Sequence, residues 1–415
     1  MPVTLRLVDT LAPGLRVWVP TLSNESQRLA DELRADPERA RGVTFAGVQF
    51  PGIDRFDYLA VHPEARALGW FMTPALRRGL AEGRAELRAQ DYLGIVRELR
   101  EGEPFDVACA QLTPPDADGW CAPGLSADFL PFVWPRAKRR IAHLNPRLPR
   151  LASSFRVHVS EIDIAVEADA PLLDHAETRG GALEARIGAH AATLVRDGDT
   201  LQFGIGSVPL SLAQSLASHR RLRFHGGMLP AAFRTLWDAG AIDRDAPVIT
   251  GLVLGDAALR EHAATLPGLR LEPVTVTHDP AHLATLPRFV AINGAVEVDL
   301  FGQVNAERTS GAILAGAGGL PAVAQGALAS PGGRLVIVLP ATAKGGSVSR
   351  IVPALGAQSL VTLPRQLADA IVTEHGVAEL RGRSLDARAQ ALIEIAAPGH
   401  RAALAAAWDE ILRHA

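Results

Sequence analysis

Short strand-like runs alternate with longer helical patterns along almost the whole chain, and this alternation limits the folds open to it. In the first part we expect helices at residues 27–35, 74–88 and 92–100. We expect strands at residues 15–19, 43–47, 107–112, 141–144 and 157–162. Strands that alternate with helices predict crossover units on a mostly parallel sheet, so this part is predicted to be α/β.

The same alternation resumes after a break at residues 179–181. A helix is expected near residues 183–195, and strands are expected near residues 200–203, 248–254, 289–292, 335–339 and 370–373. Two alanine-rich closing helices, at residues 385–395 and 401–413, look amphipathic and indicate packing rather than a site. A length of 415 residues allows roughly two or three domains, and the pattern favours two α/β units.

Composition and charge exclude several classes of protein. With 48% hydrophobic and 21% charged residues, the chain can bury a core and is not a disordered tail. Lys138 and Lys344 are the only lysines, but 45 acidic residues are interleaved with the arginines, so no nucleic-acid footprint is present. No run approaches the roughly 18 to 20 apolar residues of a membrane span, and residues 1–20 do not resemble a signal peptide.

Common catalytic and cofactor motifs are missing. Two cysteines, Cys109 and Cys121, lack disulfide or zinc spacing and fit a reducing cytoplasm. The histidines are scattered, so no metal site is predicted, and serine-hydrolase, Walker and zinc-helix motifs do not occur. Residues 204–209 resemble a dinucleotide turn, but Pro209 stands where that fingerprint requires glycine. We therefore interpret them as a tight structural turn.

One segment, residues 293–305, has the period-two pattern of a strand. The pattern places the carboxylates of Glu297 and Asp299 on one face about 7 Å apart, close enough to perturb each other's ionisation. An edge strand with a solvated face is the simpler interpretation, whereas the density of glycine and asparagine favours a bent strand end. Downstream, residues 316–319 can present backbone N–H groups to an anion, or form a flexible loop.

Several longer motifs occur in a consistent order. In the first half they are residues 113–119, 145–149 and 157–163, followed by residues 197–206. In the second half they are residues 292–307, 344–353 and 372–382. Together they resemble the acetyl-CoA hydrolase/transferase family, which includes 4-hydroxybutyrate, acetate and butyrate CoA-transferases.

The resemblance implies an architecture and a reaction centre. It implies two NagB/RpiA-like α/β domains of CoA-transferase type, residues 1–185 and 186–415, with the active site in the cleft between them. Glu297 matches the nucleophilic glutamate of the family, and Gly376 would donate an N–H to the oxyanion of the intermediate. CoA and acyl-CoA are implied as substrates rather than as a tightly bound cofactor, with a small carboxylic acid as partner and a homodimer as assembly.

The resemblance also implies a set of residues that would line the CoA site. These are Val274, Thr275, Val276, Thr277, His278, Val372, Gly376, Glu394, Lys344, Gly318 and Gly319.

Lys344 is one of the two lysines of the chain and lies in one of the motifs. The compact ammonium of lysine and the forked guanidinium of arginine do not make equivalent contacts with a ligand. We expect Lys344→Arg to impair thioester chemistry, measured as kcat/KM, more than a typical surface exchange does. Of the 42 basic residues all but two are arginine, and unchanged kinetics would mean that this preference for arginine is compositional drift.

Three departures from the family pattern bear on substrate choice. After Gly319 the chain continues Leu-Pro-Ala-Val, where relatives usually carry an acidic residue and an aromatic. A His-Thr-Glu-Met or His-Ser-Glu-Met sequence reads His-Gly-Gly-Met at residues 225–228, and Asn-Asp-Pro reads His-Asp-Pro at residues 278–280. We therefore expect chemistry on a CoA thioester with an unusual acyl group or acceptor.

A glutamate nucleophile suits this chemistry. A carboxylate needs no general base at neutral pH, and a thiolate whose conjugate acid has a pKa of about 8.5 departs without acid help. The first hypothesis is a CoA-transferase that works through a glutamyl-CoA thioester, and the second is an acyl-CoA hydrolase in which water resolves the same intermediate. A CoA-binding protein without turnover is the third.

Overall fold

The computed structural model describes residues 5–176, 179–309 and 311–414, which pack as two compact units. The first unit holds the described residues of Met1–Ala176, with Ile249–Thr277 and Leu314–Gly316. The second holds those of Glu177–Val248, His278–Ile313 and Ala317–Ala415. Both units are therefore discontinuous in sequence. The division into two CoA-transferase-type α/β domains, expected between residues 185 and 186, stays a prediction.

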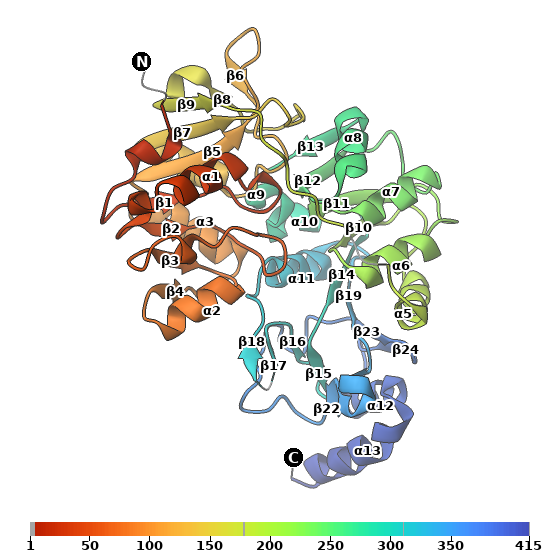
Figure 1. The fold of residues 1–415 in the computed structure, drawn as a ribbon. Helices are drawn as coiled ribbons and strands as arrows, with labels where there is room; N and C mark the ends of the chain where they lie inside the picture. The colour runs from red at the N-terminus through yellow and green to blue at the C-terminus, as the bar shows by residue number, and fades with distance from the viewer. Residues whose placement is uncertain (1–4, 177–178, 310, 415) are drawn as a thin grey trace. The chain divides into compact units, whose positions relative to one another are not determined.

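The first unit is built on a parallel sheet with the strand order β4-β3-β2-β1-β5-β7-β9 (Figure 1). Its strands are β1 (Arg16–Trp18), β2 (Thr44–Ala46), β3 (Arg66–Gly69), β4 (Ala85–Leu87), β5 (Val107–Leu112), β7 (Arg139–Leu144) and β9 (Ile164–Glu167). Its helices are α1 (Gln27–Ala35), α2 (Pro74–Ala81), α3 (Tyr92–Glu101), α4 (Leu130–Val133), α8 (Ala257–Thr265) and α9 (Val274–Thr277). Every residue of β5 is buried, as expected for a strand inside a parallel sheet covered on both faces.

Shorter elements complete the first unit. Two strands, β6 (Trp120–Cys121) and β8 (Val157–His158), pair antiparallel outside the main sheet. Further strands are β13 (Leu269–Leu271) and β12 (Val248–Val253), of which the first residue, Val248, belongs to the second unit. Single turns of 3-10 helix are η1 (Leu7–Thr10), η2 (Leu22–Asn24), η3 (Pro37–Ala40), η4 (Tyr58–Ala60), η5 (Trp134–Arg136) and η6 (Val159–Glu161).

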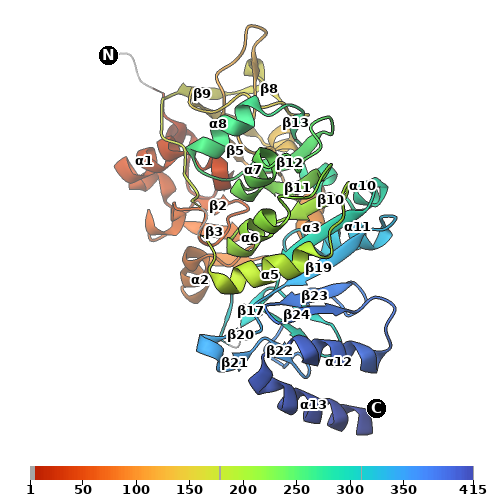
Figure 2. The same cartoon turned by 90° about the vertical axis from the view of Figure 1, so that its right-hand side faces the viewer.

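The second unit contains strands in the order β11-β10-β14-β19-β23-β24, parallel except for the closing hairpin. They are β10 (Thr200–Phe203), β11 (Arg223–Leu229), β14 (Phe289–Gly294), β19 (Arg334–Val338), β23 (Ala370–Thr373) and β24 (Gly376–Glu379). Helices α5 (Ala182–Ala192), α6 (Ser207–Ser215) and α7 (Ala231–Asp238) lie on one side of these strands, and α10 (Pro280–Thr285) and α11 (Leu320–Ala329) lie on the other (Figures 1 and 2). The predicted α/β class with mostly parallel sheets is confirmed.

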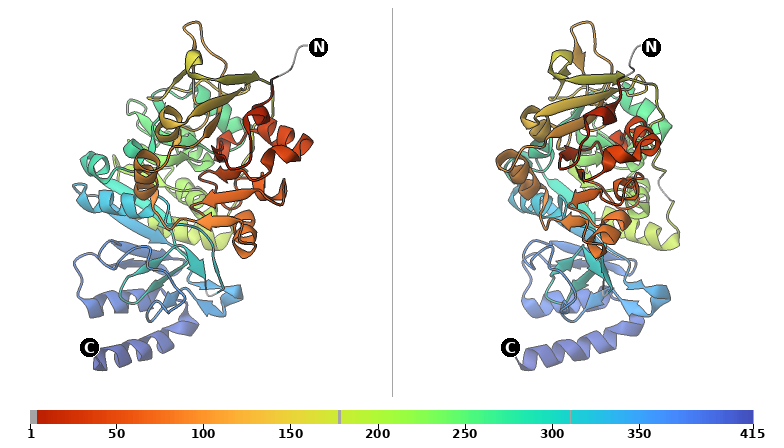
Figure 3. Two further views of the ribbon diagram at one scale, coloured as in Figure 1. Left: turned by 90° about the vertical axis from the view of Figure 1, so that its left-hand side faces the viewer. Right: turned by 60° about the vertical axis from the view of Figure 1, so that its left-hand side comes forward.

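A small second sheet in this unit has the order β16-β15-β22. Its strands are β15 (Glu297–Asp299), β16 (Val304–Asn305) and β22 (Ile351–Val352), so β15 is central and the edge-strand interpretation of residues 293–305 is wrong. Val298 and Val304 are fully buried in one core with Trp408 of the outermost helix α13 (Pro398–Arg413), the dark blue helix at the C-terminus in Figure 3. The remaining elements are α12 (Leu385–Ile395), η7 (Lys344–Gly346), β17 (Arg308–Thr309), β18 (Ala312–Ile313), β20 (Thr342–Ala343) and β21 (Val348–Ser349).

Several predicted bounds differ from the observed ones, and two predicted elements extend much too far. The helix expected over residues 74–88 ends at Ala81, because Gly83, at φ +70°, turns the chain into β4. The strand expected over residues 157–162 stops at His158, since the Glu161 carboxylate accepts the His158 N–H at 3.0 Å and closes the helical turn η6. By contrast, the predicted bounds are correct for five elements, namely α1, β5, β10, β23 and α12.

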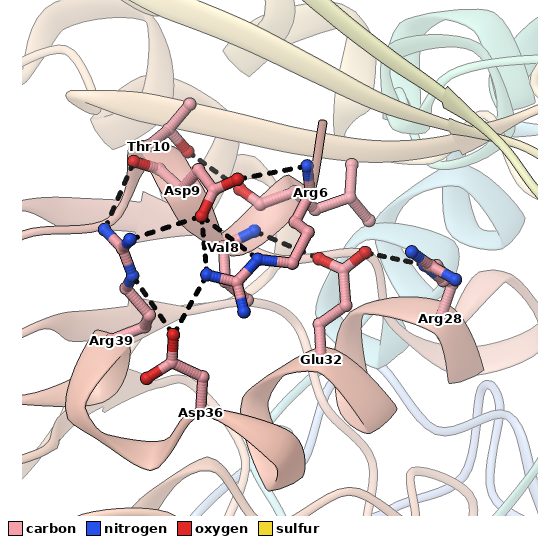
Figure 4. Close-up of polar contacts among 9 residues, drawn as sticks. Arg6, Val8, Asp9, Thr10, Arg28, Glu32, Asp36 and Arg39 are labelled. Carbon is pink, nitrogen blue, oxygen red and sulfur yellow. Dashed lines mark hydrogen bonds and ion pairs between the residues drawn. The ribbon is translucent and has the colours of Figure 1, made fainter. Parts of the chain in front are cut away.

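An ionic network in the first unit ties the start of the described chain to α1 (Figure 4). Arg6 donates to Asp9 at 2.7 Å, and this hydrogen bond lowers the pKa of the Asp9 carboxyl. Glu32 of α1 is only 6% exposed. It accepts the Val8 N–H at 3.1 Å and the Arg28 Nε–H at 2.6 Å. Removing the Glu32 carboxylate would therefore leave the buried backbone N–H of Val8 without this acceptor.

Glu32→Ala is expected to lower the free energy of unfolding by about 2 kcal/mol, because the buried Val8 N–H loses its acceptor. Urea denaturation measures the loss. Asp31→Ala on the same helix is the matched control, since Asp31 is exposed and pairs only at the surface, where such pairs contribute at most about 1 kcal/mol. Equal losses in the two variants would contradict this account of the network.

Candidate active site

Glu297 opens the central strand of the small sheet, and its two carboxylate oxygens have different surroundings. Oε1 accepts a hydrogen bond from Asn305 Nδ2 at 2.9 Å and another from the Ser359 hydroxyl. Within residues 5–176, 179–309 and 311–414, no hydrogen bond to Oε2 is present. The side chain is half-buried. The donors to Glu297 in the described residues therefore all meet one oxygen, Oε1.

The orientation of the Asn305 amide is determined by its own neighbours. Asn305 is fully buried and lies directly opposite Glu297 in the antiparallel β15–β16 pair. Its Oδ1 accepts the backbone N–H groups of Glu307 and Arg308, each at 3.0 Å. Because the oxygen side is occupied by donors, the NH₂ side must face Glu297.

Asp299, the second carboxylate of the strand, has a structural role. It is fully buried, and its Oδ1 accepts the N–H groups of Phe301 and Gln303, at 3.1 and 2.8 Å. Its Oδ2 accepts Gln303 Nε2 at 2.8 Å and the Leu355 N–H at 3.2 Å. Asp299 therefore fixes the β15–β16 turn and the loop that leads to Ser359, rather than forming an acid–base pair with Glu297.

Gly376 lies at a tightly held hairpin. It follows β23 after two intervening residues and has φ +146°, in the range that favours glycine. The Thr373 hydroxyl donates to the Ile395 carbonyl at 2.6 Å and accepts the His375 N–H at 3.1 Å, which fixes the turn. Val372, in β23, is fully buried. No hydrogen bond joins Gly376 to Glu297 in the described chain, so the oxyanion role of Gly376 stays a prediction.

Four other expected CoA contacts also lie in the second unit. Gly318 is buried with φ +59°, and Gly319 is the N-cap of α11. Lys344 is exposed at φ +49°, in η7, and Glu394 is exposed on α12. The side chains of Lys344 and Glu394 are thus accessible to a ligand. Their roles, and those of the two glycines, stay predictions.

The segment expected to line the CoA site at residues 274–278 is divided. Val274, Thr275, Val276 and Thr277 form α9 of the first unit, where Val274 is a fully buried core residue and Thr277 is fully buried. His278 belongs to the second unit and is also buried. The CoA contacts of this segment stay predictions.

His278 occupies space that Gly227 leaves open. A Cβ atom at residue 227 would lie 2.4 Å from His278 Cε1, closer than any side chain tolerates. Burial, reinforced by the charge of His225, lowers the pKa of His278 to about 3. Glycine at residue 227 and histidine at residue 278 are both departures from the expected family pattern. They are sterically coupled, because the His278 ring fits only where residue 227 has no side chain.

The structure also describes the two cysteines, the acidic and histidine side chains, and the glycine turn that the sequence analysis considered. Cys109 and Cys121 are both buried and free. Among the described residues, no three His, Cys, Asp or Glu side chains gather as metal ligands would, and no helix has the length and apolarity needed to cross a bilayer. Gly206, at φ +113°, precedes α6 in the turn interpreted as structural.

Sequence reasoning missed both donors to Glu297. Asn305 lies inside the motif at residues 292–307, but its alternation with apolar residues gave no indication that it hydrogen-bonds to the glutamate. Ser359 lies 62 positions after Glu297 in a stretch with no period or motif. Only the folded positions of β15 and the loop after β22 bring the two side chains together.

Comparisons with known proteins agree with the motifs. A family model described as acetyl-CoA hydrolase/transferase C-terminal domain matches residues 255–408. A 4-hydroxybutyrate coenzyme A transferase of Clostridium kluyveri is 34% identical over 341 residues, which cover 80% of each chain. A succinyl-CoA:cyclohexane-1-carboxylate CoA transferase of Geobacter metallireducens is 31% identical over 82% of this chain and 80% of that protein.

A solved structure extends the agreement to the fold. The crystal structure of RipA from Yersinia pestis matches with a TM-score of 0.88 at 26% identity, covering 97% of this chain and 96% of that one. The chain belongs to the acetyl-CoA hydrolase/transferase family. The resemblance inferred from the motifs is thereby confirmed.

Gly227→Ala is expected to destabilise the protein by about 1 to 3 kcal/mol, because the new Cβ overlaps the His278 ring. The smaller side chain of His278→Asn relieves that overlap, so the double variant should lose less than the sum of the single losses by about 1 kcal/mol or more. Urea unfolding of the four proteins measures this coupling. Strictly additive losses would contradict the steric pairing.

His278 should also make the protein sensitive to acid. The folded state keeps this imidazole neutral down to about pH 3, whereas an unfolded histidine binds a proton below about pH 6.5. In that window the unfolded state binds more protons, so stability falls as the pH falls. Unfolding at pH 7, 6 and 5 should show His278→Asn gaining on the wild type by about 1 kcal/mol per pH unit below pH 6. Parallel pH curves would refute this assignment.

Proposed function

We propose that this chain is a CoA-transferase that moves CoA from an acyl-CoA to a small carboxylic acid through a thioester on Glu297. The observation that carries the proposal is the Glu297 carboxylate, whose Oε1 is held by Asn305 and Ser359, while no described residue donates to Oε2. The relatives named as CoA transferases support the same class of reaction.

The proposed reaction begins with attack of Glu297 Oε2 on the thioester carbonyl. The C–S bond breaks, and CoA leaves as a thiolate, which needs no acid because its conjugate acid has a pKa of about 8.5. The thiolate then attacks the glutamyl carbon of the mixed anhydride and releases the first acid. A second carboxylate repeats these steps in reverse and leaves as the new acyl-CoA.

Binding groups are proposed on the same basis. The Gly376 N–H would stabilise the oxyanion formed on the acyl group, as backbone donors do in comparable sites. The CoA moiety would be lined by Val274, Thr275, Val276, Thr277, His278, Val372, Lys344, Glu394, Gly318 and Gly319. Contacts to this non-reacting part supply binding energy for the transition state.

The proposed partners are an acyl-CoA and a small carboxylic acid, and the proposed assembly is a homodimer. The homodimer rests on the family membership. Light scattering tests it: a mass of twice 44.0 kDa supports the dimer, and a single chain mass excludes it.

Glu297→Gln is expected to lower CoA exchange between an acyl-CoA and an isotopically labelled acid by roughly 10³-fold or more, because an amide is a poor nucleophile. Glu410→Gln is the matched control. Glu410 is an exposed glutamate on α13 that pairs with Arg413 and His414 at the surface, so its substitution should leave exchange unchanged. Full exchange activity in Glu297→Gln would overturn the proposal.

The fate of the intermediate separates the proposed transferase from the other two functions. CoA release from an acyl-CoA is measured with and without added acetate or succinate. Formation of a new acyl-CoA that requires the added acid supports the transferase. Equal CoA release without any acid identifies a hydrolase, and tight CoA binding with no turnover across a panel of acyl-CoA substrates identifies a binding protein.

A further inference from the structure

The two donors that meet Glu297 converge on a single oxygen, Oε1. A carboxylate that only needed to be anchored would be served equally by one donor on each oxygen. Two donors on one oxygen instead form the arrangement that stabilises a negative charge on that atom. During the proposed reaction, a full negative charge develops on a glutamyl oxygen whenever the glutamyl carbon is attacked.

Both donors are held by the surrounding backbone rather than by each other. Asn305 is fixed by the N–H groups on its Oδ1, as described above. The loop that carries Ser359 is tied at one end, where the Leu355 N–H donates to buried Asp299. At the other end, the N–H groups of residues 362 and 363 donate to the Val304 carbonyl at 2.9 and 3.1 Å. The donors are thus preorganised.

We propose that Asn305 Nδ2–H and Ser359 Oγ–H form an oxyanion site for the glutamyl carbon, with Oε1 as the oxygen that carries the charge. Oε2 is then the attacking oxygen. Asp299 is the positioning residue that holds the strand turn and the loop on which the two donors lie. This proposal rests on the proposed function and adds to it the assignment of the two glutamyl oxygens.

The assignment accounts for every bond in the exchange. Oε2 bonds to the acyl carbon as the thiolate leaves, which gives the anhydride. The thiolate then attacks the glutamyl carbon, and the C=Oε1 electron pair moves onto Oε1, where the two donors meet it. When that pair returns, the bond from the glutamyl carbon to Oε2 breaks, and the released carboxylate carries Oε2 away. Attack of the second carboxylate on the thioester places charge on Oε1 again.

Ser359→Ala is the discriminating variant, because among the described residues the Ser359 hydroxyl makes a hydrogen bond to Glu297 alone, whereas the Asn305 amide also holds the backbone. The thioester form is prepared with an acyl-CoA that the wild type accepts, separated from free CoA and mixed with hydroxylamine, which attacks the glutamyl carbon directly. CoA release should be about 10- to 100-fold slower in Ser359→Ala than in the wild type. The final amount of thioester per protein should be unchanged, and Ser359→Thr should restore most of the rate.

Ser215→Ala is the matched control. The Ser215 hydroxyl donates to the Ser211 carbonyl on α6 of the same unit, so its loss should leave hydroxylamine cleavage at the wild-type rate. A wild-type rate in Ser359→Ala, or failure of Ser359→Thr to restore it, overturns the oxyanion site while the proposed function stands. Absence of any thioester in the wild type overturns the proposed function itself. Circular dichroism and the unfolding temperature of each variant establish that the compared proteins are folded.

Discussion

The hydrogen bonds to the buried Asp299 carboxylate are the interactions on which the arrangement around Glu297 depends. A carboxylate removed from water is costly unless its lone pairs are satisfied. Asp299 meets this requirement with four donors, three from the β15–β16 turn and one from the loop after β22. The need to satisfy one charge therefore brings together the two segments that supply the donors to Glu297.

A second constraint acts by shape rather than by charge. Gly227 and His278 lie about fifty residues apart in the sequence, and nothing in the sequence connects the missing side chain of one with the imidazole of the other. In the fold they share one space, because the ring fills the position of the missing Cβ. His278 is buried and its pKa is lowered to about 3, so this space in the second unit holds an imidazole that is neutral near pH 7.

The parts of the fold that follow local rules could be predicted from sequence. Helix α1 begins after Ser26, whose hydroxyl accepts the Leu29 N–H, and its apolar period is clear, so its bounds are correct. Strand β5 is apolar at every position except Gln111, and its predicted bounds are likewise correct. The sequence pattern remains helical beyond Gly83 and therefore predicts too long a helix from Pro74. In the structure, the left-handed conformation of Gly83 ends the helical region.

The candidate site divides in the same way. The family is confirmed by comparison, whereas the role of Glu297, which was predicted from a local strand period and motif, stays a prediction. The edge-strand interpretation failed because nothing local indicates that residues 351 and 352 supply the second neighbour of β15. Ser359 and the role of Asp299 were missed for the same reason, since both depend on contacts between segments more than fifty residues apart.

The central claim is that Glu297 becomes covalently joined to CoA, and peptide mapping tests it most directly. The protein is incubated with an accepted acyl-CoA in the absence of any acceptor acid, reduced with borohydride and digested, and the peptides are sequenced by mass spectrometry. The account predicts one modified residue, Glu297, reduced from a carboxyl to an alcohol. Modification at another residue, or an unmodified Glu297 peptide while the acyl-CoA is turned over, would contradict it.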